Sequence, residues 1–222
     1  MTARDKSPEA EESFSRLYKD YWPPLYSYLR RRGRSHAESE EITQDFFVTL
    51  VTKNRLSRLG REGGRFRSFL LTSMQNFLAN IHDRDTAAKR GGGVPVLSFD
   101  EISAEPDRTF VTDGKPPEVE FDREWALLVL KRALAAIEQE FSAGNKQKLF
   151  AALRPQLQGD RGGRPYPEIA AELTMTESAV KVAVHRMRQR YGEILREEIQ
   201  RTVGSPADVQ EELRHLLCIV GS

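Results

Sequence analysis

The chain has 222 residues, which is enough for one large domain or two small ones. Charged residues make up 30% and hydrophobic residues 39% of it, a balance that suits helical domains with modest cores. No apolar run approaches the roughly 18 residues that a membrane span needs, and residues 1–13 lack the apolar stretch of a signal peptide. The single cysteine, Cys218, excludes an internal disulfide. We therefore expect a cytoplasmic protein with no membrane contact.

Charge is unevenly spread along a chain whose net charge is only +1. Residues 1–90 have 17 Lys and Arg against 12 Asp and Glu, and residues 125–203 have 13 against 9. Residues 91–124 have 3 against 9, and the tail from residue 204 has 1 against 3. Affinity for nucleic acid grows with the number of phosphates that a protein neutralises. We therefore expect the chain to bind DNA weakly by itself and to need a partner.

Hydrophobic residues at helical spacing predict two helices near the N-terminus. The first covers residues 9–32 and is expected to bend or break at Pro23 and Pro24. The second covers residues 37–53 and follows a plausible capping box at residues 35–38, in which a serine and a glutamate bind each other's backbone N–H groups.

A basic, glycine-rich loop at residues 54–65 leads into a third helix that runs from Phe66 to residue 83 or beyond. Residues 91–121 contain four prolines and show no sustained period, which is typical of a linker. From residue 122 the helical period returns, and residues 146–157 predict another short helix.

A last helix is predicted at residues 206–220. Its apolar face is expected to contain Val209, Leu213, Leu216, Leu217 and Val220, and its polar face Glu211, Glu212 and Arg214. We favour packing of the apolar face on the chain's own second unit over capture of a partner. The predicted fold is all-α: two small helical domains at residues 9–90 and 122–203, a flexible linker at 91–121, and an amphipathic helical extension at 204–222.

Residues 165–190 have the pattern of a helix-turn-helix, with apolar positions around a small alanine, Ala170, where two helices cross. A recognition helix enters the major groove by its N-terminal half and places flanking cations near phosphates. The exposed residues assigned to DNA binding here are Thr176, Glu177, Ser178, Lys181, Val182, His185, Arg186 and Arg188. An ordinary helical pair with solvated charges would give a similar pattern, and that alternative stays open.

The loop and helix after residue 54 form a second candidate site for DNA. Arginines at 55, 58, 61, 65, 67 and 84 alternate with Phe66, Phe69, Asn76 and Asn80. Cations interleaved with aromatic and amide groups suit single-stranded DNA, whose bases stack on rings while its backbone charge is neutralised. Phe66 and Phe69 are also at helical spacing, so we favour a core role over a stacking role for both rings.

The sequence shows no pattern that favours catalysis. The four histidines are scattered without metal-ligand spacing, and the triple glycine at residues 91–93 is not followed by the Gly-Lys of a phosphate loop. We therefore expect a protein that is not an enzyme, with no catalytic residues, no metal and no cofactor.

The order of these parts resembles the extracytoplasmic-function (group IV) sigma factors of bacterial RNA polymerase. AESEEITQDFFVTLV at residues 37–51 is similar to sigma region 2.2, and RFRSFLLTSMQNFLANIHDR at 65–84 is similar to regions 2.3 and 2.4. YPEIAAELTMTESAVKVAVHRMRQR at 166–190 is similar to region 4.2. The family commonly has Gly where this chain has Thr174, a position that often needs a positive φ.

The resemblance implies a role for each part. Residues 9–90 would be region 2, which binds core polymerase and recognises and melts the −10 element, and residues 122–203 would be region 4, which reads the −35 element. Core polymerase, through its clamp coiled coil and its flap, and promoter DNA are the implied partners; an anti-sigma factor or other regulator is left open. The clamp interface is assigned to Glu41, Gln44 and Asp45. The −10 and melting residues are assigned as Arg58, Arg61, Arg65, Phe66, Arg67, Asn76, Asn80 and Arg84.

Two other functions remain possible from the sequence. One is a helix-turn-helix transcriptional regulator with an N-terminal dimerisation or ligand-binding domain, which would bind two half-sites one helical turn apart. The other is a helical adaptor that does not bind DNA and uses residues 204–222 to bind a partner.

Overall fold

The structure is a computed structural model that describes residues 8–52, 65–90, 114–158 and 163–221. Over these residues every regular element is helical, apart from one isolated antiparallel bridge between Arg65 and Val203. The predicted all-α class is confirmed. None of the described helices is both long enough and apolar enough to span a membrane.

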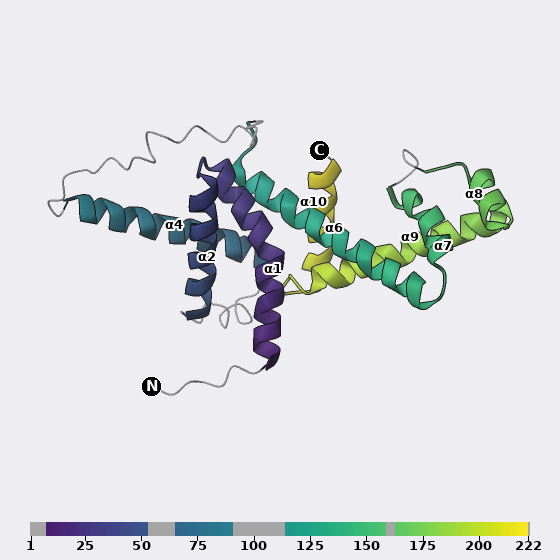
Figure 1. The fold of residues 1–222 in the computed structure, drawn as a ribbon, viewed down its shortest axis with the longest axis horizontal. Helices are drawn as coiled ribbons and strands as arrows, with labels where there is room; N and C mark the ends of the chain where they lie inside the picture. Colours follow the sequence, from purple (N-terminus) through teal and green to yellow (C-terminus); the bar gives the residue numbers. More distant parts are fainter. Residues whose placement is uncertain (1–7, 53–64, 91–113, 159–162, 222) are drawn as a thin grey trace.

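The helices follow the order expected from the sequence (Figure 1). They are α1 (Pro8–Arg31), α2 (His36–Thr52), α4 (Phe66–Arg90), α6 (Pro117–Ala143), α7 (Gln147–Leu153), the 3₁₀ helix η2 (Arg154–Gln158), α8 (Tyr166–Leu173), α9 (Glu177–Gln200) and α10 (Asp208–Gly221).

The described helices form an elongated molecule with a bundle at each end (Figure 1). Helices α1, α2 and α4 lie at one end, and α7, α8 and the first half of α9 lie at the other. The long helices α6 and α9 pack against each other and connect the two ends. Helix α10 packs on α6 and α9 between the two ends, which agrees with the expectation that it covers the chain's own second unit.

Helix α1 continues through Pro23 and Pro24 and is not broken there. Proline removes a backbone donor, so two hydrogen bonds to the preceding turn are lost at this point. The residues that follow, Leu25, Tyr28 and Leu29, are fully buried. Packing of this apolar face outweighs the local cost, a tertiary effect that periodicity alone does not reveal.

Helix α2 begins with the capping box that the sequence predicts. The backbone N–H of Ser35 donates to Oε2 of Glu38 at 2.8 Å, and the N–H of Glu38 donates to Oγ of Ser35 at 3.3 Å. The hydrogen bond from the Ser35 backbone is the main cause of a lowered pKa at Glu38. The box thus satisfies N–H groups that a helix start otherwise leaves unpaired.

Helix α6 begins at Pro117, so the predicted linker boundary at residue 121 is too late. Proline at the first helical position has no N–H to leave unpaired, and its φ is already helical. Glu118 and Glu120 follow in the first turn, where acidic groups interact favourably with the helix dipole. The rest of the predicted linker up to residue 113 lies outside the described residues.

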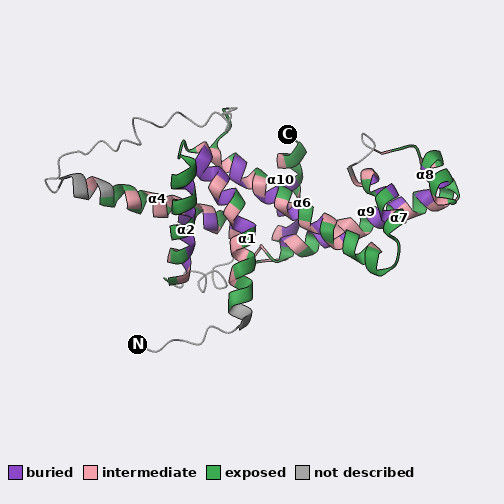
Figure 2. Ribbon diagram, in the orientation of Figure 1, coloured by how far each residue is buried: buried purple, intermediate pink, exposed green. Residues whose placement is uncertain are grey.

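The two units expected as separate domains pack against each other in this structure. Helix α1 of the first unit packs along α6 of the second, and one hydrophobic core continues from one unit into the other (Figure 2). Leu25 and Tyr28 of α1 are buried in that core, and so are Trp125 and Val129 of α6. The position of each candidate site is therefore fixed relative to the other.

Candidate nucleic-acid interface

Helices α8 and α9 meet at a short turn whose geometry is built by two threonines. Thr174 ends α8 in the left-handed conformation, with φ 53° and ψ 45°. Thr176 caps α9, because its Oγ1 accepts a hydrogen bond from the backbone N–H of Ala179 at 3.2 Å. The positive φ expected at Thr174 is confirmed, although the residue is β-branched and adopts this conformation at a cost.

The N-terminal half of α9 buries one face and exposes the other. Val180, Val184 and Met187 are buried in the core. Seven residues assigned to DNA from the sequence are exposed on this half of the helix: Thr176, Glu177, Ser178, Lys181, Val182, His185 and Arg186. Val182 is 48% exposed, which leaves it available for contact.

Two cations of this face already have partners within the chain. Lys181 pairs with Glu177 one turn earlier, with Nζ and Oε1 2.9 Å apart. Both groups are about half exposed, so the pair is worth little and is easily exchanged for a phosphate. Arg188 donates from Nε and Nη2 to the carbonyl oxygen of Gln156, at 2.9 and 2.7 Å, and so fastens α9 to η2.

The start of α4 is covered by acidic residues of α6 and α10 in this structure. Arg67 is buried, with its side chain only 7% exposed. Its Nε and Nη2 donate to the carboxylate of Glu212, its Nη1 donates to Asp122, and its guanidinium lies 5.2 Å from the ring centre of Trp125. Burial alone lowers the pKa of Arg67, but the hydrogen bond to Glu212 and the charge of Asp122 outweigh it and raise that pKa. The assignment of Arg67 to DNA therefore does not hold in this arrangement.

Arg65 and Phe66 are also engaged at this point. Nη2 of Arg65 lies 2.6 Å from Oε1 of Glu211, and its Nε lies 3.0 Å from Oε2 of Glu212. The ring of Phe66 packs edge-on against Tyr21 at 5.1 Å and lies beside Phe69 at 6.3 Å. This contact supports the core role favoured for Phe66 over a stacking role.

The other residues expected at the −10 element divide into exposed ones and ones that the structure does not describe. Asn76, Asn80 and Arg84 are exposed along α4, and Nδ2 of Asn80 donates to the carbonyl of Asn76 at 2.6 Å. Arg58 and Arg61 lie outside the described residues. The middle of α4 therefore exposes polar side chains to solvent, whereas Arg67 at the start of the same helix is buried.

Helix α2 presents the residues assigned to core polymerase on one exposed face. Glu41, Gln44 and Asp45 are all exposed, and Phe46 and Phe47 face the core. Val48 shares the exposed face and is 54% exposed. Sequence periodicity did not single out Val48, yet its spacing of three and four residues from Asp45 and Gln44 places it on the same stripe.

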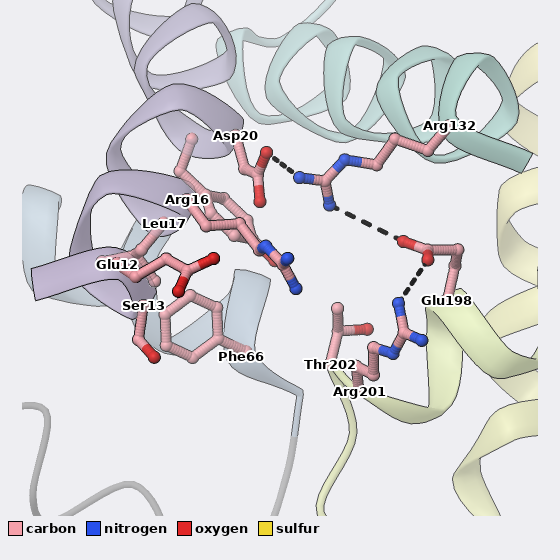
Figure 3. A pocket seen from close by; sticks show the side chains of 11 residues that line it. Glu12, Ser13, Arg16, Leu17, Asp20, Phe66, Arg132, Glu198, Arg201 and Thr202 are labelled. Carbon is pink, nitrogen blue, oxygen red and sulfur yellow. Dashed lines mark hydrogen bonds and ion pairs between the residues drawn. The ribbon is translucent and has the colours of Figure 1, made fainter. Parts of the chain in front are cut away.

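A cleft of about 710 Å³ lies between α1, α4, α6 and α9 (Figure 3). A chain of ion pairs crosses it: Asp20 of α1 pairs with Arg132 of α6, Arg132 lies 3.7 Å from Glu198 of α9, and Glu198 lies 2.6 Å from Arg201. Phe66 lines the same cleft. These pairs connect the first unit to the second beside the covered start of α4.

The expected position of Glu212 on the solvent face of the last helix is wrong. Val209, Glu212 and Leu216 are the buried residues of α10, whereas Leu217 and Val220 are exposed. Position 212 is three residues after 209 and four before 216, so the helical period includes it in the buried stripe. Burial is tolerated because two arginines neutralise the Glu212 carboxylate.

Comparison with known proteins identifies the first unit. Residues 17–85 match the protein-family model Sigma-70 region 2. No curated protein and no solved structure matches the chain. The match begins in α1, includes α2 and ends in α4, and so contains the exposed face of α2 and the covered start of α4. The first helical unit is thus similar to sigma-70 region 2, which supports a factor of the sigma-70 family.

Proposed function

We propose that the protein is a sigma factor of the extracytoplasmic-function type that binds core RNA polymerase and directs it to specific promoters. The observation that carries the proposal is the match of residues 17–85 to Sigma-70 region 2. Sigma-70 factors initiate transcription with core RNA polymerase at promoter DNA and are not enzymes. The group and the promoter specificity go beyond that match and are our inference.

The exposed face of α2 supports the contact with polymerase. Glu41, Gln44 and Asp45 point to solvent with Val48 beside them, so a partner would meet two acidic groups, an amide and an apolar side chain. Such a mixed face can bury apolar area while its carboxylates pair with cations of a coiled coil. We assign this face to the clamp of core polymerase.

The pair α8 and α9 supports the contact with the −35 element. Its exposed N-terminal half presents Lys181 and Arg186 at one end of the molecule, far from α4 in the view of Figure 1. Separated DNA-binding surfaces suit two separated promoter elements better than one compact operator. This arrangement favours a sigma factor over a dimeric regulator, which would bring two identical recognition helices to neighbouring half-sites.

The charge balance supports the need for polymerase. The covered start of α4 uses Asp122, Glu211 and Glu212 to neutralise Arg65 and Arg67. These two cations are therefore less available to DNA while the chain is alone. A sigma factor that engages DNA as part of a holoenzyme can tolerate this, because polymerase supplies most of the phosphate contacts.

The proposal is tested by co-purification of the tagged protein with core enzyme from its own cells. We expect the wild-type chain to retain core polymerase and the double substitution Glu41→Ala, Asp45→Ala to lose most of it. The control is Glu40→Gln, an exposed neighbour on the flank of this face that lies 3.7 Å from His36. Absence of core enzyme from the wild-type eluate would contradict the proposal and favour the adaptor or regulator alternatives.

A further inference from the structure

The C-terminal helix α10 lies directly on the part of region 2 that the −10 element would need. Glu211 and Glu212 are adjacent on α10, and both pair with Arg65; Glu212 also pairs with Arg67. The Glu212 side chain is 1% exposed and that of Arg67 is 7% exposed. Two acidic groups of one helix thus neutralise two arginines at the start of another.

The backbone holds α10 at this place as well. The N–H of Phe66 donates to the carbonyl of Thr202 at 2.9 Å, and Arg65 and Val203 form an antiparallel bridge. Thr202 and Val203 belong to the turn that connects α9 to α10. The start of α4 is therefore fastened to the same turn that positions the acidic helix.

The geometry points to α10 as an intramolecular latch, which uses Glu211 and Glu212 to keep Arg65 and Arg67 away from nucleic acid until the chain opens. This inference rests on the proposed function, because it assigns regulation to the −10 surface of region 2. The guanidinium of Arg67 is in a buried ion pair and cannot neutralise a phosphate at the same time, whereas Arg65, with its side chain 28% exposed, is covered less completely. The two carboxylates occupy the donors that a DNA backbone would otherwise engage.

The latch has the energetics of a contact that can open. Val209 and Leu216 are its buried apolar residues, while Leu217 and Val220 remain exposed, so its apolar contact with the rest of the chain is narrow. Buried ion pairs contribute little net stability, because both charges regain water when the pair separates as a whole. Phosphates can then replace the carboxylates as partners of the arginines.

The latch is tested in the full chain with a protease site inserted between Gly204 and Ser205. The purified protein is cut after it has folded, and α10 is separated by gel filtration at high salt. Binding of a fluorescein-labelled, mixed-sequence single-stranded 20-mer is then followed by anisotropy over a range of salt concentrations. The matched control has the same site after Ser222, where cutting leaves α10 attached.

The cut chain is expected to bind the 20-mer more tightly and with a steeper dependence on salt. Cutting takes Glu211 and Glu212 away from both arginines, while Asp122 of α6 still pairs with Arg67. The slope of log K against log salt should therefore steepen by at most about 1.4, since each phosphate contact on a single strand contributes about 0.7. The same cut in a chain with Arg65→Ala and Arg67→Ala should remove that gain. Equal slopes before and after cutting, or a gain that persists without the arginines, would overturn the latch.

A second variant tests the latch if the cut chain unfolds, which circular dichroism would show as a loss of the helical signal. Glu212→Gln in the uncut chain keeps the size of the side chain and an acceptor for Arg67, but removes the one carboxylate that pairs with both arginines, leaving Glu211 for Arg65 and Asp122 for Arg67. Its salt slope should steepen relative to the parent, and an unchanged slope would overturn the latch.

Core-enzyme binding separates this inference from the proposed function. If neither the cut nor the uncut chain retains core polymerase while the slope changes, the latch stands and the sigma-factor proposal falls. If both retain core polymerase while the slope is unchanged, the sigma-factor proposal stands and the latch falls.

Discussion

Arg67 and Glu212 lie 145 positions apart in the sequence and form a buried, two-pronged ion pair between α4 and α10. The pair belongs to a polar cluster that also contains Asp122 of α6 and His215 of α10. Arg67 donates to Asp122, and Nε2 of His215 lies 3.0 Å from Oδ2 of Asp122. The first unit, the second unit and the C-terminal extension therefore meet at one polar cluster.

Removing Arg67 should destabilise the folded chain strongly. Arg67→Ala leaves Glu212 buried with Arg65 as its remaining cation and uncovers the ring of Trp125. Breaking a buried pair from one side costs about 3–5 kcal/mol, which urea unfolding at pH 7 would measure as a lower free energy of unfolding. Arg190→Ala is the control, because Arg190 pairs with Glu140, Glu193 and Glu197 at the surface and should change stability little. Similar losses for both variants would contradict the special role of the buried cluster.

Thr174→Gly should stabilise the chain. Thr174 adopts a left-handed conformation with φ 53°, which costs an L-residue about 1–2 kcal/mol. Glycine removes that cost but adds entropy to the unfolded chain, so we expect a net gain of about 0.5–1 kcal/mol in thermal or urea unfolding. Asn145→Gly is the matched control, because Asn145 has φ 54° but asparagine tolerates this conformation better. A smaller gain at Thr174 than at Asn145 would contradict the strain argument.

The capping box should make part of the stability depend on pH. The folded-state pKa of Glu38 lies below its unfolded value, mainly because its carboxylate accepts a hydrogen bond from the Ser35 backbone. The contribution is therefore fully present above the unfolded pKa and is lost as pH falls through the folded pKa. Glu38→Gln should be less stable than wild type at pH 7, and the difference should shrink on acidification.

Ser35→Ala is the control for the capping box. It removes the Oγ acceptor at a cost of about 0.5–2 kcal/mol, but it keeps the backbone N–H that binds Glu38. Its loss should therefore persist at acidic pH, where the loss of Glu38→Gln fades. A pH-independent difference for Glu38→Gln would refute the role of the charged carboxylate.

Lys181→Ala should weaken binding of the holoenzyme to the −35 element. Lys181 is exposed on the N-terminal half of α9 and pairs loosely with Glu177. Loss of a bidentate base contact would cost about 1–3 kcal/mol, measurable as reduced −35 protection in a footprint with core enzyme. Arg196→Ala removes the same charge from an exposed site further along α9 and should leave the footprint unchanged. Wild-type footprints from both variants would refute the proposed recognition face.

Most helices could be predicted from the sequence because local signals determine them. The capping box of α2 and the apolar stripe of α9 are short-range features, and both are observed as expected. That α1 bends or breaks at Pro23 and Pro24 was expected, but that it stays one helix rather than breaking could not be predicted, because this depends on burial against other helices.

The covered start of α4 was missed for a similar reason. The position of Glu212 between Val209 and Leu216 was visible in the sequence, but an acidic residue is buried only when cations are near. Those cations, Arg65 and Arg67, lie about 145 residues earlier, and their proximity is a tertiary fact. Candidate residues for DNA could therefore be chosen from the sequence, while only the structure shows that Arg65 and Arg67 are paired with carboxylates of α6 and α10.

The most direct test of the central claim is transcription with purified core RNA polymerase from the same cells. The protein is added to core enzyme and a library of genomic promoter fragments, and run-off transcripts are sequenced. We expect transcripts that depend on the added protein, share upstream elements near −10 and −35, and decrease when Glu41 and Asp45 are replaced by alanine. Transcripts that are the same with and without the protein would contradict a sigma factor.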